Sequence, residues 1–452
     1  MSRTPLPLFR LLRSVIWIGL LAVTAGLCFF VPPASAVDAN QPLITNALAS
    51  NTAIVDLDAQ EPTQEPSQGQ AGSSPPENEP KSYMDIYGFL MLDFGYQVKV
   101  NNPDWFDVNR PSKLPAFSGE FGKNGNTYFG VRQTRFGVKG EQYTGLGPLK
   151  YEFEFDLFGV GVDAGQTTIR PRHFYGEIGP VLAGQTNSVF MDINVFPNTI
   201  EYWGPNGMVF LRNPQLRYTP ASGATSFMIA LEKPGASGDA GAIADRIDLS
   251  SVHARFQFPD VSAAIAHTWE NKSYIRLAGI VRDFKIDNVA TGFTQNIVGW
   301  GVNASSNIVI RKDIIRLQYV VGDGIENYMN DAPFDVAPEV NVGNLANPIK
   351  GKAVPMHSWV AYLDHTWSDK LTSAIGYSEL VMENPNLQPA DAFREGRYAS
   401  VNLLYSPFKT FMAGGEFLYG RRFNFRDGFN PNDYRMQFSF KYSFDFKVFG
   451  QK

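Results

Sequence analysis

The chain has 452 residues, of which 44% are hydrophobic and 13% aromatic, and its formal net charge is −5. Its single cysteine excludes a disulfide framework and any cysteine-based metal or redox site, and with this acidic balance no nucleic-acid partner is expected. Beyond the N-terminus, no apolar run reaches the roughly 18 residues that a membrane-spanning helix needs.

The N-terminus has the three regions of a secretory signal peptide. Three arginines without any acid are followed by an apolar run over residues 15–31 and by the small residues Ala34 and Ala36. Cleavage after Ala36 is predicted in preference to a retained membrane anchor. Cys28 follows Leu27, where a lipoprotein signal would place a small residue, so lipid attachment is not expected. An exported chain that is rich in aromatics and has no spanning helix fits the outer membrane, surrounded by lipid and lipopolysaccharide.

Residues 37–81 form an acidic leader. Seven acidic residues against one lysine give it a net charge of −6, and its second half is built mainly from Pro, Glu, Gln, Ser and Gly. This composition is typical of disorder, so a disordered periplasmic tether is favoured over a short self-association helix. The predicted organisation is a cleaved signal peptide at residues 1–36, the leader at 37–81 and an outer-membrane barrel at 82–452.

From residue 82 onward, apolar and polar residues alternate with a period of two. The stretch YRMQFSFKYSF at residues 434–444 places Met436 and Phe438 on one parity and Arg435 and Gln437 on the other. Successive side chains of a strand point to opposite faces, and about 10 such residues span a bilayer when tilted. Because lipid offers no hydrogen-bond partner to the backbone groups at an open sheet edge, the pattern predicts a closed, all-β antiparallel barrel.

Sixteen strands are predicted, beginning near residues 83, 127, 149, 166, 181, 208, 225, 261, 273, 292, 311, 356, 371, 397, 410 and 434. A seventeenth stretch at residues 250–258 is assigned to a loop, because a single-chain bacterial barrel needs an even strand count. Short periplasmic turns are expected at 179–180, 270–272, 368–369 and 406–407. Long extracellular connections are expected at 97–124, 233–260, 322–354 and 381–395.

The parity opposite to the lipid face must line the pore. The pore and substrate-binding residues predicted on this basis are Arg135, Lys139, Arg276, Arg282, Arg316, Arg435 and Glu416, with Lys441 beside them and the acids Glu152, Glu154, Asp156 and Asp364 opposite. Opposed acids and bases create a transverse field, and arginine binds carboxylates bidentately. A mild anion preference is therefore predicted, with a basic ladder of four arginines, Arg135, Arg276, Arg282 and Arg316. Cross-strand ion pairs that only stabilise the wall are an equally open interpretation.

Three arginines do not follow the simple parity. Arg132 has an odd spacing to Arg135, so a bulge or a rim position is predicted there. Arg170 and Arg172 share the parity of Phe174 and are placed at the outer mouth of their strand.

Long stretches of the chain resemble the DcaP-like family of trimeric outer-membrane porins. The resemblance is strongest over residues 184–218, GQTNSVFMDINVFPNTIEYWGPNGMVFLRNPQLRY, and is supported by DIYGFLMLDFGY from Asp85, IRLAGIVRDF from Ile275, GDGIENYMND from Gly322 and GGEFLYGRR from Gly414. It implies a 16-stranded homotrimer that passes small anionic solutes, dicarboxylates among them. It also implies a constriction loop folded into the lumen after strand five, at residues 191–207. The constriction residues expected in or next to this loop are Asp192, Glu201, Tyr202, Trp203 and Arg212.

The end of the chain departs from the family pattern. Relatives usually end at the aromatic that matches Phe444, where the barrel-assembly machinery reads the final strand, but this chain continues as DFKVFGQK. Phe444, Phe446 and Phe449 are the candidates for that role.

Six apolar residues gather around the expected loop, Phe190, Phe196, Tyr202, Trp203, Met208 and Phe210. An aromatic slide for a ring-bearing substrate is one interpretation. A small core that keeps the loop folded is the favoured one, because buried aromatics mostly serve packing.

Other functions find less support. None of the five histidines lies in a Ser or Cys nucleophile motif or has metal-ligand spacing on a common face, so no enzyme activity, metal or cofactor is expected. The prediction is a porin for small hydrophilic solutes. Its alternatives are a phosphate or other anion-selective porin and a structural envelope barrel.

Overall fold

A computed structural model describes residues 82–242, 244 and 249–449. The predictions for the signal peptide and the leader concern residues 1–81, which lie outside this range. Within the described part of the chain, no helix is long and apolar enough to cross a membrane. Its helical elements are short 3-10 turns: η1 (Pro103–Trp105), η2 (Pro111–Lys113), η3 (Gly161–Asp163), η4 (Ile193–Val195) and η5 (Glu326–Tyr328).

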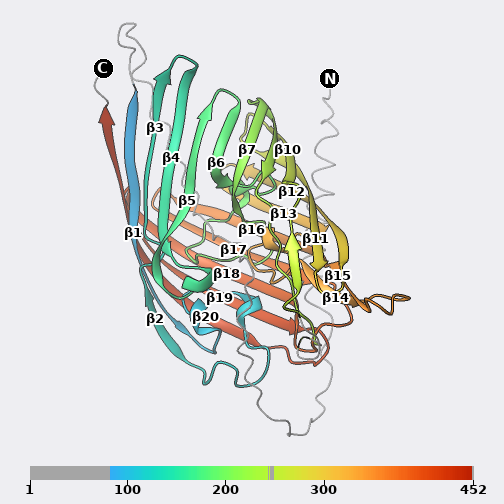
Figure 1. Cartoon of the computed structure of the whole chain (residues 1–452). Helices are drawn as coiled ribbons and strands as arrows, with labels where there is room; N and C mark the ends of the chain where they lie inside the picture. Colours follow the sequence, from blue (N-terminus) through green and yellow to red (C-terminus); the bar gives the residue numbers. More distant parts are fainter. Residues whose placement is uncertain (1–81, 243, 245–248, 450–452) are drawn as a thin grey trace, which may run out of the picture. The chain divides into compact units, whose positions relative to one another are not determined.

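Strands make up most of the described residues (Figure 1). They are β1 (Tyr83–Gln97), β2 (Asn126–Gly130), β3 (Arg135–Thr144), β4 (Gly147–Phe158), β5 (Thr167–Ile178), β6 (Val181–Asn187), β7 (Arg212–Ala221), β8 (Thr225–Glu232), β9 (Val252–Arg255), β10 (Asp260–Thr268), β11 (Tyr274–Asn288), β12 (Phe293–Ile310), β13 (Asp313–Asp323), β14 (Val336–Val340), β15 (Ile349–Ala353), β16 (Pro355–Ser368), β17 (Leu371–Met382), β18 (Phe393–Phe408), β19 (Phe411–Asn424) and β20 (Asn432–Phe449).

Eighteen of these strands form one antiparallel sheet, and β14 and β15 form a separate hairpin. The sheet closes because β1 pairs with β20 on one side and with β2 and β3 on the other. β2 and β3 follow one another along β1, and β9 and β10 follow one another along β11. The 18 strands therefore fill 16 positions in the wall, and the predicted 16-stranded antiparallel barrel is confirmed.

Three predicted boundaries need correction. Residues 250–258 are not entirely a loop, because β9 pairs with the end of β11. β9 adds no further strand to the barrel, since it lies in line with β10 along the same edge of β11. The turn predicted at residues 406–407 lies at 409–410, since the strand continues through a register shift around Pro407, which lacks the backbone N–H that a regular ladder uses. The strand predicted from residue 208 begins at Arg212, because the Phe210 N–H donates to the Tyr328 carbonyl in the lumen at 2.8 Å instead of to a neighbouring strand.

The two faces of the wall follow the predicted parity. On β20, the side chains of Met436, Phe438 and Phe440 are exposed, whereas those of Arg435 and Gln437 are buried. An exposed apolar row and a buried polar row are the arrangement of a barrel that faces lipid outside and polar groups inside. The outward row does not stop at Phe444: the exposed Phe446 continues it, and β20 pairs with β1 as far as the Tyr83–Phe449 pair.

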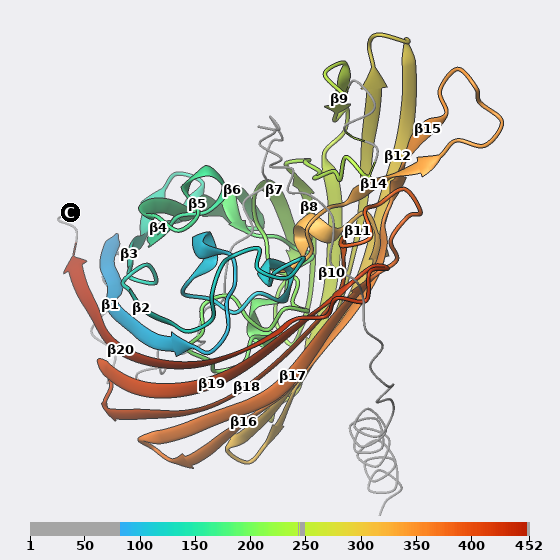
Figure 2. The ribbon, with the colours of Figure 1, turned by 90° about the horizontal axis from the view of Figure 1, so that it is seen from below.

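Short and long connections alternate around the barrel. The connections at residues 145–146, 179–180, 311–312, 369–370 and 409–410 are two-residue turns, and the long segments 98–125, 188–211 and 324–354 lie at the opposite end. By the usual length rule, the short turns mark the periplasmic rim. The view along the barrel shows the segment after β1 inside the ring of strands (Figure 2). The main buried apolar cluster combines residues from all three long segments, among them Trp105, Phe190 and Tyr328.

Candidate constriction site

The segment of residues 188–211 after β6, called the infolded loop below, is fastened to the wall by polar side chains. Arg276 on β11 donates from Nη2 to the carbonyl oxygen of Val189 at 2.5 Å. The Asp192 carboxylate accepts hydrogen bonds from the hydroxyls of Tyr274, at 2.8 Å, and Ser305, at 2.5 Å. These contacts place the first half of the loop against β11 and β12, so Arg276 and Asp192 lie where loop and wall meet.

Arg316 on β13 has a similar place. Its Nη1 donates to the carbonyl oxygen of Asn194 at 2.5 Å, and its Nε lies 2.6 Å from the Asp364 carboxylate. Asn307 donates to the same carbonyl at 2.7 Å. The guanidinium therefore connects an inward acid of the wall to the backbone of the loop.

Glu416 on β19 holds the middle of the loop. Its carboxylate accepts the backbone N–H of Ile200 at 2.9 Å and the amide of Asn402 at 2.9 Å. Asn402 also donates to the carbonyl of Asn198 at 2.8 Å. The predicted inward direction of Glu416 is thus confirmed by its contacts, all of which reach the loop or the neighbouring strand.

Glu201 is the most densely bonded acid of the loop. Its carboxylate accepts the backbone N–H groups of Asn109, at 2.9 Å, Trp203, at 3.0 Å, and Gly204, and the Tyr398 hydroxyl at 3.2 Å. Burial raises the pKa of Glu201 from 4.5 to about 7, and the backbone N–H donors limit this rise. One carboxylate therefore ties the turn of the infolded loop to the segment 98–125 and to β18.

The raised pKa of Glu201 predicts a pH effect. The folded protein binds this proton more tightly than the unfolded chain, so the contribution to stability is full below about pH 4.5 and is lost as the pH rises to about 7. The unfolding temperature of the wild type in detergent should therefore fall relative to that of Glu201→Gln across this interval. Parallel curves for the two proteins would contradict the assignment.

The apolar residues of the loop form a core. Tyr202 stacks on Phe158 with ring centres 4.3 Å apart, and Trp203 meets Trp105 edge-on at 4.6 Å. All six apolar residues singled out in the sequence are buried: Phe190, Phe196, Tyr202, Trp203, Met208 and Phe210. Because these side chains are buried among other protein groups and do not face open lumen, the packing interpretation agrees with the structure better than the aromatic slide.

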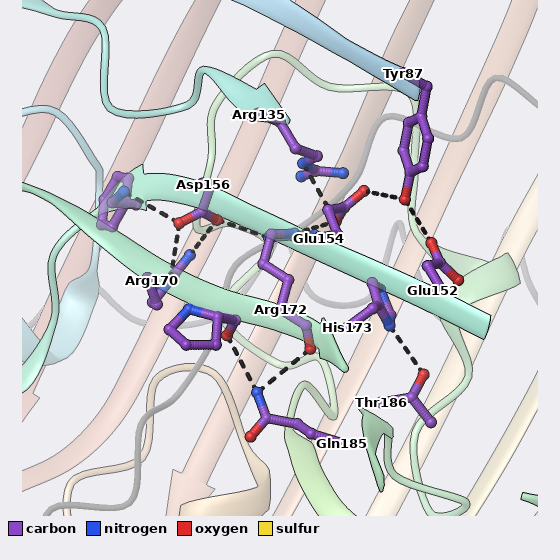
Figure 3. A network of polar contacts seen from close by, with 12 residues as sticks. Tyr87, Arg135, Glu152, Glu154, Asp156, Arg170, Arg172, His173, Gln185 and Thr186 are labelled. Atoms are coloured by element: carbon purple, nitrogen blue, oxygen red, sulfur yellow. Dashed lines mark hydrogen bonds and ion pairs between the residues drawn. The ribbon is translucent and has the colours of Figure 1, made fainter. Parts of the chain in front are cut away.

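A charged network lies beside this core on β3, β4 and β5 (Figure 3). Arg170 binds Asp156 through two nitrogens, at 3.0 and 2.7 Å. Arg172 reaches Glu154 at 2.6 Å and Asp156 at 2.9 Å, and Arg135 lies 3.6 Å from Glu154. Buried arginines and carboxylates thus alternate along one patch of the inner wall.

Arg170 and Arg172 share the sequence parity of Phe174, but they do not share its direction. Both guanidinium groups point into the lumen, whereas Phe174 is exposed on the outside. The register of β4 and β5 shifts between Glu154 and Phe155, where Arg172 is the extra residue. A β-bulge of this kind inverts the parity of the residues that follow it, here as far as the second register shift, between Asp156 and Phe158.

The predicted irregularity at Arg132 is confirmed. Residues 131–134 interrupt the strand between β2 and β3. The buried Arg132 side chain turns into the lumen, where Nη1 lies 2.6 Å from the Asp107 carboxylate and Nη2 donates to the Gly159 carbonyl at 2.8 Å.

Lys139 and Lys441 occupy the periplasmic half of the inner wall. The ammonium of Lys139 lies 4.9 Å from the ring centre of Tyr87, and that of Lys441 lies 4.5 Å from the ring of Phe89. Both side chains are only half-buried. In Figure 3 the Tyr87 hydroxyl points between two carboxylates, and it donates to Glu152 at 2.6 Å.

The remaining predicted residues are more deeply enclosed. Arg282 is 1% exposed and binds Asp260 at 3.0 Å and Asp335 at 2.8 Å. Arg435 is buried with its guanidinium carbon 4.9 Å from the Tyr128 ring, and Arg212 is buried 4.9 Å from the Phe210 ring.

One set of contacts in the lumen had no signal in the sequence. Arg110 pairs with Asp331 at 3.0 Å, and its guanidinium carbon lies 4.2 Å from the Trp105 ring and 4.3 Å from the Trp203 ring. Ser112 adds a backbone N–H to the same carboxylate at 3.0 Å. The three long segments therefore meet at one buried ion pair. Its partners are 221 residues apart in the chain, and neither lies in an alternating stretch that would assign it to a face.

Within the part of the chain that the structure describes, no group of three or more His, Cys, Asp and Glu side chains could hold a metal ion.

Comparison with known proteins places this geometry in context. A family model described as DcaP outer membrane protein matches residues 84–333. No curated protein matches the sequence. Among solved structures, the outer membrane channel DcaP of Acinetobacter baumannii is 21% identical, with 81% of this chain and 99% of that chain covered and a TM-score of 0.66. An anion-selective porin from Comamonas acidovorans is 10% identical over 80% and 100% of the two chains, with a TM-score of 0.51. A loop-deletion mutant of OmpT from Vibrio cholerae is 13% identical over 81% and 100%, with a TM-score of 0.50.

Proposed function

The chain belongs to the DcaP outer membrane protein family, and from this membership and its porin fold we propose that it is a diffusion channel for small hydrophilic solutes with a mild preference for anionic carboxylates. The solved DcaP structure is described as an outer membrane channel, which supports the transport part of the proposal. We further propose that three copies assemble and that the C-terminal strand guides insertion by the assembly machinery.

The charge balance beside the infolded loop carries the anion preference. Five cationic side chains share the inner wall of β20, β1 and β3–β5, namely Arg135, Lys139, Arg170, Arg172 and Lys441. They face three acids, Glu152, Glu154 and Asp156. Within this contact network the cations outnumber the acids five to three, and this local excess favours anions in a narrow hydrated passage. The same strands carry Arg435 and the buried acids Asp93 and Asp433 outside the network.

The arginines of the predicted ladder have different places in this proposal. Arg135 lies within the cationic wall, whereas Arg276 and Arg316 hold the infolded loop and give the constriction its position. Arg282 is enclosed by two carboxylates and assigned to wall stability. Selectivity is therefore assigned mainly to Arg135, Lys139 and Lys441.

Reversal potentials in a planar bilayer test this proposal. Under a KCl gradient the purified protein should prefer chloride, and Lys139→Gln/Lys441→Gln should move the reversal potential towards zero, since three cations would then face three acids. Lys350→Gln is the matched control, because Lys350 pairs with Glu339 on the separate hairpin at 3.4 Å. Cation selectivity of the wild type would refute the anion preference.

Two further measurements separate the alternatives. Blockade of single channels by a dicarboxylate at lower concentration than by phosphate favours the carboxylate channel over a phosphate channel. A purely structural envelope barrel would leave liposomes impermeable to small solutes in an uptake assay.

A further inference from the structure

We propose that two outward-facing arginines near the extracellular rim, Arg397 on β18 and Arg421 on β19, bind a phosphate group of a lipid in the surrounding outer leaflet. The site lies on the outside of the wall, so it is separate from the pore and does not rest on the proposed transport function. Strands β17–β20, which carry the site and its surroundings, are consecutive neighbours in the wall (Figure 2).

Both arginines point away from the lumen. Arg397 shares its parity on β18 with the exposed Val401, whereas Tyr398, the next residue, is buried. Arg421 shares its parity on β19 with the exposed Phe417. The register between β18 and β19 is regular over this stretch, so the two guanidinium groups lie on the lipid side of the wall.

The two arginines lie just beyond the aromatic girdle of the extracellular side. The turn at residues 409–410 is periplasmic, so the opposite ends of β18 and β19 are extracellular. One outward row across β17–β20 consists of Tyr377, Ala399, Tyr419 and Tyr434, and the next row towards the extracellular ends consists of Glu379, Arg397, Arg421 and Asn432. Since aromatic girdles mark the membrane interfaces of a barrel, the arginines are at the level of lipid headgroups.

The pair has the geometry of a divided anion site. Arg397 and Arg421 are directly opposite each other on neighbouring strands, and like charges in this position destabilise a sheet. Their guanidinium carbons lie over the same ring, that of Phe423, at 4.7 and 4.5 Å from its centre. Stacking on the ring orients both groups. A phosphate between them accepts hydrogen bonds from both and removes their repulsion.

The neighbouring acids do not neutralise the whole cluster. Glu395 accepts from Nε of Arg397 at 2.6 Å, and Glu379 lies 3.4 Å from the same nitrogen. Arg394 also pairs with Glu395, at 3.7 Å. Among the described residues, no carboxylate forms an ion pair with Arg421, whose Nε has no hydrogen-bond partner. The surplus positive charge is therefore on Arg421, where a lipid phosphate supplies the opposite charge.

The wall below the arginines favours a lipid over a free phosphate ion. Val401 and Leu403 continue the outward parity of Arg397 towards the middle of the apolar band and are 42% and 51% exposed. Acyl chains attached to a phosphate at the arginines cover these side chains, and the burial of apolar surface adds to the phosphate contacts. Lipid A, the acylated and phosphorylated part of lipopolysaccharide, combines both chemistries in the outer leaflet.

Native mass spectrometry of the purified protein in detergent tests the site. The protein is titrated with bisphosphorylated lipid A and with the same lipid after removal of its phosphates. The wild type should bind lipid A at a concentration about tenfold lower than the dephosphorylated lipid, and Arg397→Gln/Arg421→Gln should remove this difference by weakening the binding of lipid A about tenfold. An excess of inorganic phosphate should not displace lipid A.

Arg255→Gln/Lys285→Gln is the matched control. It also removes two cations that are opposite each other on neighbouring strands, β9 and β11, but Arg255 there pairs with Asp287. This control should bind lipid A like the wild type. Arg421→Gln alone breaks no ion pair among the described residues, so it covers the case in which the double variant folds poorly. It should weaken the binding of lipid A by a smaller factor.

Equal binding of the two lipids by the wild type, or unchanged binding of lipid A in both arginine variants, would overturn the site. Displacement of lipid A by inorganic phosphate would also overturn it, in favour of a site for free anions. Loss of the proposed trimer in the double variant with unchanged lipid binding would instead assign the arginines to a contact between copies. The anion preference of the pore is measured separately in KCl, so none of these outcomes affects it.

Discussion

Arg282→Met should lower the stability of the barrel by about 3–5 kcal/mol, because it removes one partner of a buried ion pair and leaves the other charged. Among the described residues, Arg282 has the only guanidinium that pairs with both Asp260 and Asp335. It also donates hydrogen bonds to the carbonyls of Gly235 and Gly324. Methionine fills similar space but satisfies none of these acceptors. The unfolding temperature in detergent measures the loss.

Arg255→Met provides the comparison for Arg282→Met. Arg255 also pairs with an aspartate across neighbouring strands, Asp287, but it is 43% exposed. Exposed ion pairs contribute about 0–1 kcal/mol to stability, so this variant should unfold at a temperature close to that of the wild type. Equal losses in the two variants would mean that the burial of Arg282 does not determine its contribution.

Arg110→Ala should loosen the packing of the segment 98–125 against the infolded loop inside the lumen. The substitution leaves Asp331 buried without its cation and removes the group between the Trp105 and Trp203 rings. The local cost is about 3–5 kcal/mol, enough to release the segment 98–125 from the infolded loop. Single-channel conductance should rise and become noisier while the outer wall stays folded.

Lys113→Ala is the control for Arg110→Ala on the same segment. Burial lowers the pKa of Lys113 to about 8, and its ammonium lies 5.9 Å from the Trp105 ring, farther than the Arg110 guanidinium. Its removal should leave the conductance near the wild-type value. If Arg110→Ala conducts like the wild type in a folded barrel, the ion pair does not hold the segment in the lumen.

The wall of the barrel could be predicted from the sequence because its signal is local. Alternation along one strand decides which side chains face lipid, and the exposed Phe438 and the buried Arg435 follow it without reference to any other strand. The strand count needed one rule besides alternation, because the seventeenth alternating stretch at residues 250–258 was excluded to leave the even number that a single-chain barrel requires. Even the break at Arg132 was visible, as an odd spacing to Arg135.

The interior depends on contacts that alternation does not encode. The bulge at Arg172 reverses parity through a register shift against β4, and a single extra residue has no distinct sequence pattern. The Arg110–Asp331 pair joins two irregular segments. The direction of Arg282 was predictable, but its enclosure by Asp335 depends on a loop that returns more than 50 residues later.

The attachments of the infolded loop also bear on the order in which the protein is put together. Asn198 and Ile200 are held by Asn402 and Glu416, which follow them by 204 and 216 residues. These long-range contacts cannot form before the C-terminal strands β18 and β19 have joined the barrel, so the infolded loop can take its final position only after that step. A newly inserted barrel should therefore pass through an intermediate with a wide pore before the infolded loop narrows it.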